Sequence, residues 1–154
     1  MNSPLQPTSR STLGALVVGS AVIGWALVST FYGDIPRLRW YMPVWAGVLA
    51  LAEVFFGINL KSRIGRKKGA EPVDPIVAAR ALALAKASAY VGAALTGLWA
   101  GFAAYTASQW GHLISAKTDT VIAFVGVALS LALALAGLWL EQCCRVPGDS
   151  DEDY

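Results

Sequence analysis

Four long apolar stretches, separated by short charged segments, run through the chain. Residues 11–33, 87–111 and 120–140 carry no charged side chain, and residues 40–60 carry one, Glu53. A helix needs about 20 apolar residues to cross about 30 Å of hydrocarbon. The pattern therefore predicts an all-α fold: a polytopic integral membrane protein with four transmembrane helices in an antiparallel bundle.

The composition leaves little material for a soluble domain. Of the 154 residues, 56% are hydrophobic and only 14% are charged, whereas soluble domains contain about 25% charged residues. We expect a disordered tail at 1–10, one membrane domain at 11–146 and an acidic, disordered tail at 147–154. The expected spans are residues 12–32, 40–60, 82–108 and 120–142, with a basic loop at 61–74.

Prolines and capping residues indicate where the helices begin. Asp74 and Pro75 are an N-cap residue followed by proline at the first helical position, so the third helix is expected to begin there, before it enters the membrane. Pro43 is expected in the first turn of the second helix, where a missing N–H costs little. Thr118 or Asp119 is expected to cap the fourth helix.

Basic residues are concentrated on one side of the expected topology. With both termini inside, the inner side holds nine of the twelve lysines and arginines: Arg10, Lys61, Arg63, Arg66, Lys67, Lys68, Arg80, Lys86 and Arg145. Positive charge collects on the cytoplasmic side of membrane proteins. The distribution predicts an N-in, C-in protein of the bacterial inner (plasma) membrane, with Cys143 and Cys144 as free thiols in the reducing cytosol.

Glu53 is the charged residue expected deepest in the membrane, and such residues are candidates for a function. Lys86 lies at a similar depth on the next helix, so a Glu53–Lys86 pair is one interpretation. Side chains lean toward the N-terminus of their own helix, which moves these two head groups apart. Glu53 bonded to Ser88 or Tyr90 is the second interpretation, and coupling to a proton or substrate is the third.

Small residues recur at every fourth position of the third stretch, and membrane helices pack closely through such residues. The ridge comprises Ala85, Ala89, Ala93, Gly97 and Gly101. It is expected either to pack within the bundle or to receive a helix of another chain.

No pattern in the sequence names a reaction. His112, the only histidine, has no neighbouring cluster of metal-ligating residues, and no nucleophile or phosphate-binding motif is present. We therefore predict no catalytic, cofactor-binding or metal site, and the small net charge of +2 gives no reason to expect nucleic acid. The basic loop either sets the topology alone or also binds anionic lipid. Its residues are Lys61, Arg63, Arg66, Lys67 and Lys68.

Three strings of residues resemble a known family. They are residues 74–89 with the glycines that follow, residues 138–147 with their Glu-Gln-Cys-Cys-Arg-Val-Pro segment, and residues 7–14. The chain resembles the actinobacterial membrane proteins called domain of unknown function 3180. The resemblance implies a four-helix inner-membrane protein, often encoded beside folate-biosynthesis genes, with no established activity. The family pattern covers Arg80, Lys86, Glu141, Cys144 and Arg145.

Two functions are compatible with these residues. The first is a small non-enzymatic membrane protein that associates with a protein partner, a second copy of itself or anionic lipid at the cytosolic face. Its working surface would be Arg80, Lys86 and Arg145 with the basic loop, and Glu141 would complete the charge network. The alternative is a small proton-coupled transporter, or an accessory to one, that uses Glu53 and is linked to folate or pterin metabolism by the gene neighbourhood of the family.

Overall fold

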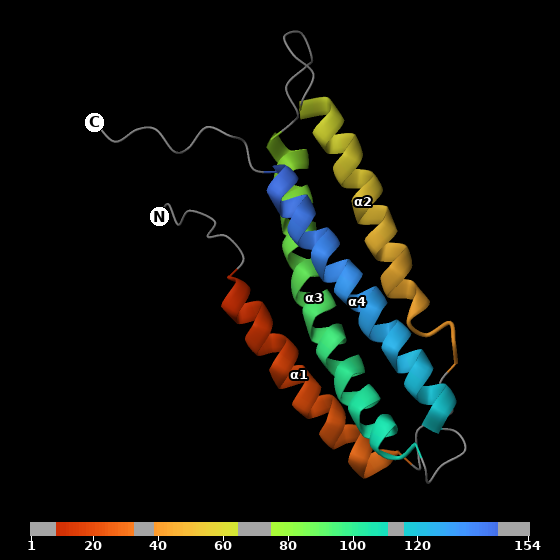
Figure 1. The fold of residues 1–154 in the computed structure, drawn as a ribbon. Helices are drawn as coiled ribbons and strands as arrows, with labels where there is room; N and C mark the ends of the chain where they lie inside the picture. The colour runs from red at the N-terminus through yellow and green to blue at the C-terminus, as the bar shows by residue number, and fades with distance from the viewer. Residues whose placement is uncertain (1–8, 33–38, 65–74, 111–115, 145–154) are drawn as a thin grey trace.

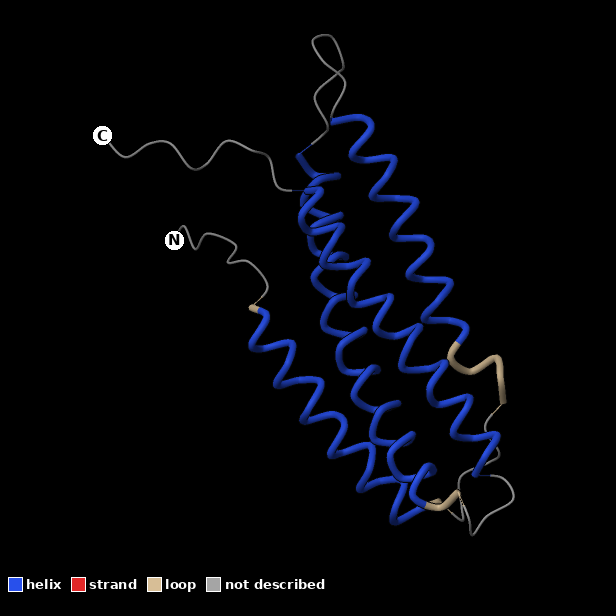
Figure 2. Tube along the Cα trace, in the orientation of Figure 1, coloured by secondary structure: helices blue, strands red, loops and turns tan. Residues whose placement is uncertain are grey.

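The computed structural model describes residues 9–32, 39–64, 75–110 and 116–144, and within them only the backbone of residues 60–64, 75, 78 and 144. These ranges contain four α-helices and no strand (Figures 1 and 2). The helices are α1 (Arg10–Phe31), α2 (Val44–Ile64), α3 (Pro75–Ser108) and α4 (Ala116–Cys144). The predicted all-α fold with four helices is confirmed. Residues 1–8 of the predicted N-terminal tail and all of the predicted tail at 147–154 lie outside the described residues.

One helix boundary agrees with the sequence, and several others depart from it. The third helix begins at Pro75, as the proline predicts. The first helix begins at Arg10, which the sequence assigned to the tail. The second helix continues to Ile64, so the first four residues of the predicted basic loop are helical. The fourth helix begins at Ala116, before either of the residues predicted to cap it.

The prediction that Pro43 lies in the first turn of the second helix is wrong. Residues 40–43 form a turn, in which the Met42 N–H donates to the Arg39 carbonyl at 3.0 Å and the Val44 N–H to the Tyr41 carbonyl at 3.2 Å. A proline ring disfavours the helical conformation of the residue before it. The regular helix α2 therefore starts only after Pro43, four residues later than expected.

The four helices form an open row in the order α1, α3, α4, α2 (Figure 1). Helix α3 packs on α1 and α4, and α4 also packs on α2, whereas α1 and α2 have no extensive contact with each other. Figure 1 shows that α1 and α3 run in one direction and that α2 and α4 run in the other. The expected antiparallel bundle is thus realised only at the central α3–α4 pair, and each outer helix lies parallel to its neighbour.

The ridge of small residues on α3 is buried within the chain, but it contacts two different helices. A Cβ atom on Gly137 of α4 would lie 2.7 Å from the Ala85 carbonyl oxygen and 2.8 Å from the Ala89 nitrogen. Gly97 and Gly101 instead face α1. A step of four residues advances about 40° beyond one full turn of a helix, so the series winds around α3. The ridge therefore packs within the chain, against α4 near its start and against α1 near its end.

The α1–α3 contact is a direct approach of two backbones. A Cβ atom on Gly97 would overlap the Ser20 hydroxyl and the Val17 carbonyl oxygen. From the other side, a Cβ atom on Gly24 would lie 2.7 Å from the Leu98 carbonyl oxygen. Helices in lipid associate through such close packing, since lipid provides no hydrophobic drive between them.

Helix α2 contacts α4 along one stripe of small residues. Ala46 and Ala50 pack against Leu133 and Ala136 of α4 in one buried cluster. Further along α2, a Cβ atom on Gly57 would overlap the ring of Trp139. The stripe leaves most of the α2 surface outside the α2–α4 contact.

Large apolar side chains are exposed on all four helices, among them Val22, Trp45, Phe55 and Leu135. Among the described residues, three helical segments are long and apolar enough to cross a membrane: Arg10–Phe31, Ala79–Ser108 and Ala116–Cys143. Val44–Asn59 is a shorter apolar helix. Three of the four predicted spans therefore have a full-length counterpart.

Candidate functional site

Glu53 lies in the interior of the helix row with only 5% of its surface exposed. It belongs to the stripe of α2 that contacts α4, and its carboxyl group accepts a hydrogen bond from the Ser88 hydroxyl of α3. Small residues of α4 allow this contact, because Ala136 faces α2 and Gly137 faces α3 at the same level. The bond links two helices that have no extensive packing contact with each other.

The second carboxyl oxygen of Glu53, Oε2, is buried and has no hydrogen-bond partner. A buried polar atom without a partner is uncommon in native proteins, because it loses its hydration without compensation. Of the partners that the sequence allowed, the structure brings Ser88 to Glu53. Tyr90 has 37% of its surface exposed, and Lys86 is half-buried.

A second charged group lies where α3 begins and α4 ends, which we call the Glu141 end. Glu141 is buried, with 5% of its surface exposed. Gly92 packs against Ala134 across the antiparallel α3–α4 pair, and in that register the residue opposite Ala85 is Glu141. Glu141 and Lys86 thus belong to the same turn of the helix pair.

The other charges predicted at the Glu141 end are only partly described. Arg80 is exposed on the first turns of α3. Lys61 and Arg63 lie on the last turn of α2, and their side chains are outside the described residues. Cys143 is a half-buried free thiol, and only the backbone of Cys144 is described. The remaining predicted residues, Arg66, Lys67, Lys68 and Arg145, as well as His112, lie outside the described residues.

The opposite end holds a polar cluster that the sequence did not predict, and we call it the Asp119 end. The Tyr32 hydroxyl, just after α1, donates a 2.8 Å hydrogen bond to Asp119 Oδ2 on α4. The Thr120 hydroxyl lies 3.0 Å from the Thr106 hydroxyl of α3 and 2.6 Å from the Ala116 carbonyl oxygen. These bonds connect α1, α3 and α4.

The Asp119 cluster also corrects one prediction. Asp119 does not cap α4, because the helix begins three residues earlier and the carboxylate accepts a hydrogen bond from the Tyr32 hydroxyl. The sequence contained a usable signal. Tyr32 ends the first predicted span and Asp119 directly precedes the fourth, so the expected topology places both residues at the same membrane surface.

Ser130 is a further buried polar residue in the middle of α4. It is fully buried, and its hydroxyl oxygen has no hydrogen-bond partner. The α3–α4 register places it opposite Thr96, whose own hydroxyl donates to the Gly92 carbonyl at 2.7 Å. A serine within a helix often satisfies its hydroxyl in this way, which Ser130 does not do.

The buried carboxyl groups of the described helices lie in three separate places, namely at Glu53, at the Glu141 end and at the Asp119 end. In the described part of the chain, no three histidine, cysteine, aspartate or glutamate side chains are grouped so that they could hold a metal ion. The arrangement can link helices, present charge at one end and hold a proton at Glu53.

Comparison with known proteins gives a family match over residues 13–148. No curated protein and no solved structure matches the chain.

Proposed function

The chain belongs to the family described as protein of unknown function (DUF3180), and from this premise we propose that it is a small non-enzymatic integral membrane protein. It crosses the bacterial inner membrane with four helices and keeps both termini in the cytosol. It acts by association with a protein partner or anionic lipid at the cytosolic face, which the Glu141 end forms.

Exposed apolar surface supports the membrane location. Soluble monomers rarely expose apolar patches larger than a few hundred Å², yet all four helices present large apolar side chains outward. Helix α2 reaches the required length together with the turn before it. The apolar turn residues 40–43 and the apolar helix Val44–Asn59 form a continuous stretch that matches the thickness of the hydrocarbon.

The single observation that carries the proposed association is the set of charges at the Glu141 end. Arg80 is exposed there, while Lys86 and Glu141 lie further inside. Burying a charge costs free energy unless the charge is paired. Ionisable residues inside membrane helices are therefore usually present for structure or recognition. Arg80 remains accessible and carries the charge that a partner or lipid headgroup would meet.

We expect Arg80→Glu to reduce the amount of copurifying protein or anionic lipid by about tenfold, because a reversed charge at a polar contact is repulsive. The measurement is a pulldown in mild detergent from native membranes, followed by mass spectrometry of proteins and lipids. Lys117→Glu is the matched control, since Lys117 is an exposed basic residue at the opposite end of the molecule. The proposal fails if both variants retain the same proteins and lipids as the unaltered chain.

A second candidate function is proton-coupled transport, or assistance to it, through Glu53. The observation that favours it is the buried, unpartnered Oε2 atom. Ionisable groups within membrane helices commonly belong to proton relays. The gene neighbourhood that the family resemblance implies would make the solute a folate or pterin compound.

For this candidate, Glu53→Gln is expected to abolish substrate-dependent proton flux in proteoliposomes, because an amide cannot bind and release the proton. Glu53→Asp keeps the acid group and is expected to retain flux. If the unaltered protein moves neither protons nor solute, transport is excluded and association remains.

A further inference from the structure

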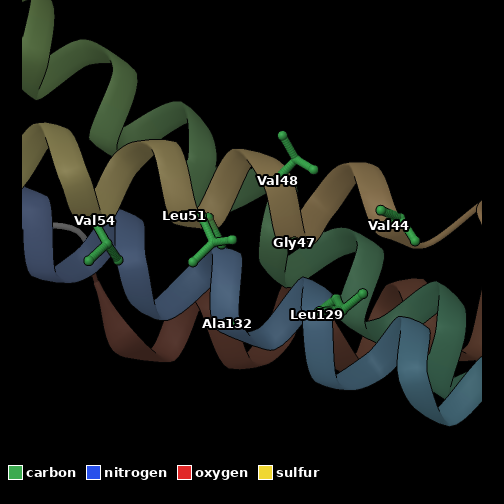
Figure 3. A pocket seen from close by; sticks show the side chains of 8 residues that line it. Val44, Gly47, Val48, Leu51, Val54, Leu129 and Ala132 are labelled. Atoms are coloured by element: carbon green, nitrogen blue, oxygen red, sulfur yellow. The ribbon is translucent and has the colours of Figure 1, made fainter.

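An apolar groove runs along the outside of the α2–α4 contact. Its volume is about 440 Å³, within the range of about 300–1,000 Å³ typical of ligand sites. Figure 3 shows its wall, with α2 on one side and α4 on the other. The lining residues are Val44, Gly47, Val48, Ala50, Leu51, Val54, Leu129 and Ala132. None of these side chains carries a hydrogen-bonding group, so the groove favours the binding of a hydrocarbon chain.

Gly47 contributes to the hollow. A Cβ atom on Gly47 would lie 3.0 Å from a terminal methyl carbon of Leu129, so any larger side chain would occupy the space between the helices. From Val44 to Val54 the groove follows α2 for about 15 Å at 1.5 Å per residue. Its direction is the helix axis, which is also the direction of acyl chains beside a spanning helix.

The turn that leads into the groove at Val44 carries a cation and aromatic rings. The Arg39 guanidinium carbon lies 5.9 Å from the centre of the Tyr41 ring, and Arg39 Nη1 donates a 3.4 Å hydrogen bond to the Tyr41 hydroxyl. Trp40 and Trp45 have 75% and 72% of their surfaces exposed. Exposed tryptophans and tyrosines are typical of the level of lipid headgroups.

We propose that the groove binds an anionic phospholipid, with one acyl chain between α2 and α4 and the phosphate at Arg39. The inference rests on the membrane location in the proposed function and goes beyond it, because this site lies at the end opposite the Glu141 charges. Arginine recognises phosphate through several N–H donors, and Arg39 gives only one hydrogen bond to Tyr41. The positive charge of the turn thus matches the phosphate of the lipid, and the apolar lining of the groove matches its acyl chain.

The rim of the groove disfavours a helix from a second copy as the occupant. Val48, Leu51 and Phe55 project outward with 52%, 61% and 64% of their surfaces exposed. Helices in membranes approach closely where small residues line both surfaces, and these bulky side chains prevent that approach. A flexible acyl chain fits between them.

The test uses the full chain, purified in mild detergent and stripped of native lipid. It is titrated with phosphatidylglycerol or with diacylglycerol of the same acyl chains, and native mass spectrometry counts the bound lipid. Ala132→Phe fills the groove from an exposed position of α4. Arg39→Gln removes the charge. Ala104→Phe is the matched control, because exposed Ala104 lines a separate groove of about 270 Å³ between α1 and α3.

The unaltered chain is expected to retain a single phosphatidylglycerol and to prefer it over diacylglycerol by about fivefold, the effect of one basic residue near an anionic lipid. Ala132→Phe should lose both lipids, Arg39→Gln should bind both equally, and Ala104→Phe should behave as the unaltered chain.

Retention of phosphatidylglycerol by Ala132→Phe, or an unchanged preference in Arg39→Gln, would overturn the lipid site. A dimer that Ala132→Phe dissociates would assign the groove to a second copy and overturn it as well. Carbonate extraction of the native membranes tests the membrane location separately, so a failure of the lipid site is distinguishable from a failure of the proposed function.

Discussion

Replacing Gly97 with leucine is expected to detach α1 from α3 and to lower the free energy of unfolding by about 3 kcal/mol. Even a Cβ atom at this position would overlap the Ser20 hydroxyl and the Val17 carbonyl oxygen. The Val17 atom belongs to the backbone and cannot rotate away. Because α3 is the only helix against which α1 packs extensively, a shift of α1 removes its main tertiary contact. Unfolding of the purified protein by denaturing detergent, followed by circular dichroism, measures the loss.

Gly19→Leu is the matched control for this substitution. Gly19 lies on α1 itself, and a Cβ atom there would meet no atom within 4 Å. The same change of residue type at this position should leave the unfolding midpoint unchanged or raise it, since the leucine faces open space and is a better helix former than glycine. Equal destabilisation by the two variants would show that the α1–α3 backbone contact does not hold α1 in place.

Leu133→Ala is expected to destabilise the α2–α4 contact by about 2 to 3 kcal/mol. Leu133 has 1% of its surface exposed and packs with Ala46, Ala50 and Ala136. The three alanines are too small to refill the cavity that the truncation leaves, and the cost of a buried leucine-to-alanine change grows with the cavity. The same unfolding assay measures the loss of unfolding free energy.

Leu135→Ala, two residues further along α4, is the control for Leu133. Leu135 has 57% of its surface exposed. In lipid or detergent the exposed leucine contacts solvent chains as apolar as itself, so its truncation should change the unfolding free energy by less than about 0.5 kcal/mol. A loss at Leu135 as large as that at Leu133 would contradict the arrangement of α2 and α4.

The parts of the fold that follow from local rules were predictable from the sequence. The number of helices followed from the uncharged stretches, and the start of α3 followed from proline at its first position. The start of α2 did not, although Pro43 was visible. Proline is accepted at the first position of a helix but also disfavours helix before it, and the sequence alone does not decide between these effects.

The neighbours of each helix were not predictable, because they depend on which faces meet. The small residues of α3 were identified, but their drift around the helix sends Ala85 to α4 and Gly97 to α1. The order of the helices in space also decides the partner of Glu53. Although α4 lies between α2 and α3, Glu53 of α2 meets Ser88 of α3, close in sequence to Ala85 and Ala89, against which Gly137 of α4 packs.

The order of the helices in the row has a consequence for biosynthesis. Helices α1 and α2 leave the ribosome first, yet each packs mainly on a helix that is made later, α3 for the first and α4 for the second. The leading half of the polypeptide therefore has little tertiary structure of its own until the second half has been made. Helix α1 acquires its packing partner only when α3 has been made, and α2 only when α4 has been made, so assembly is concentrated in the second half of synthesis.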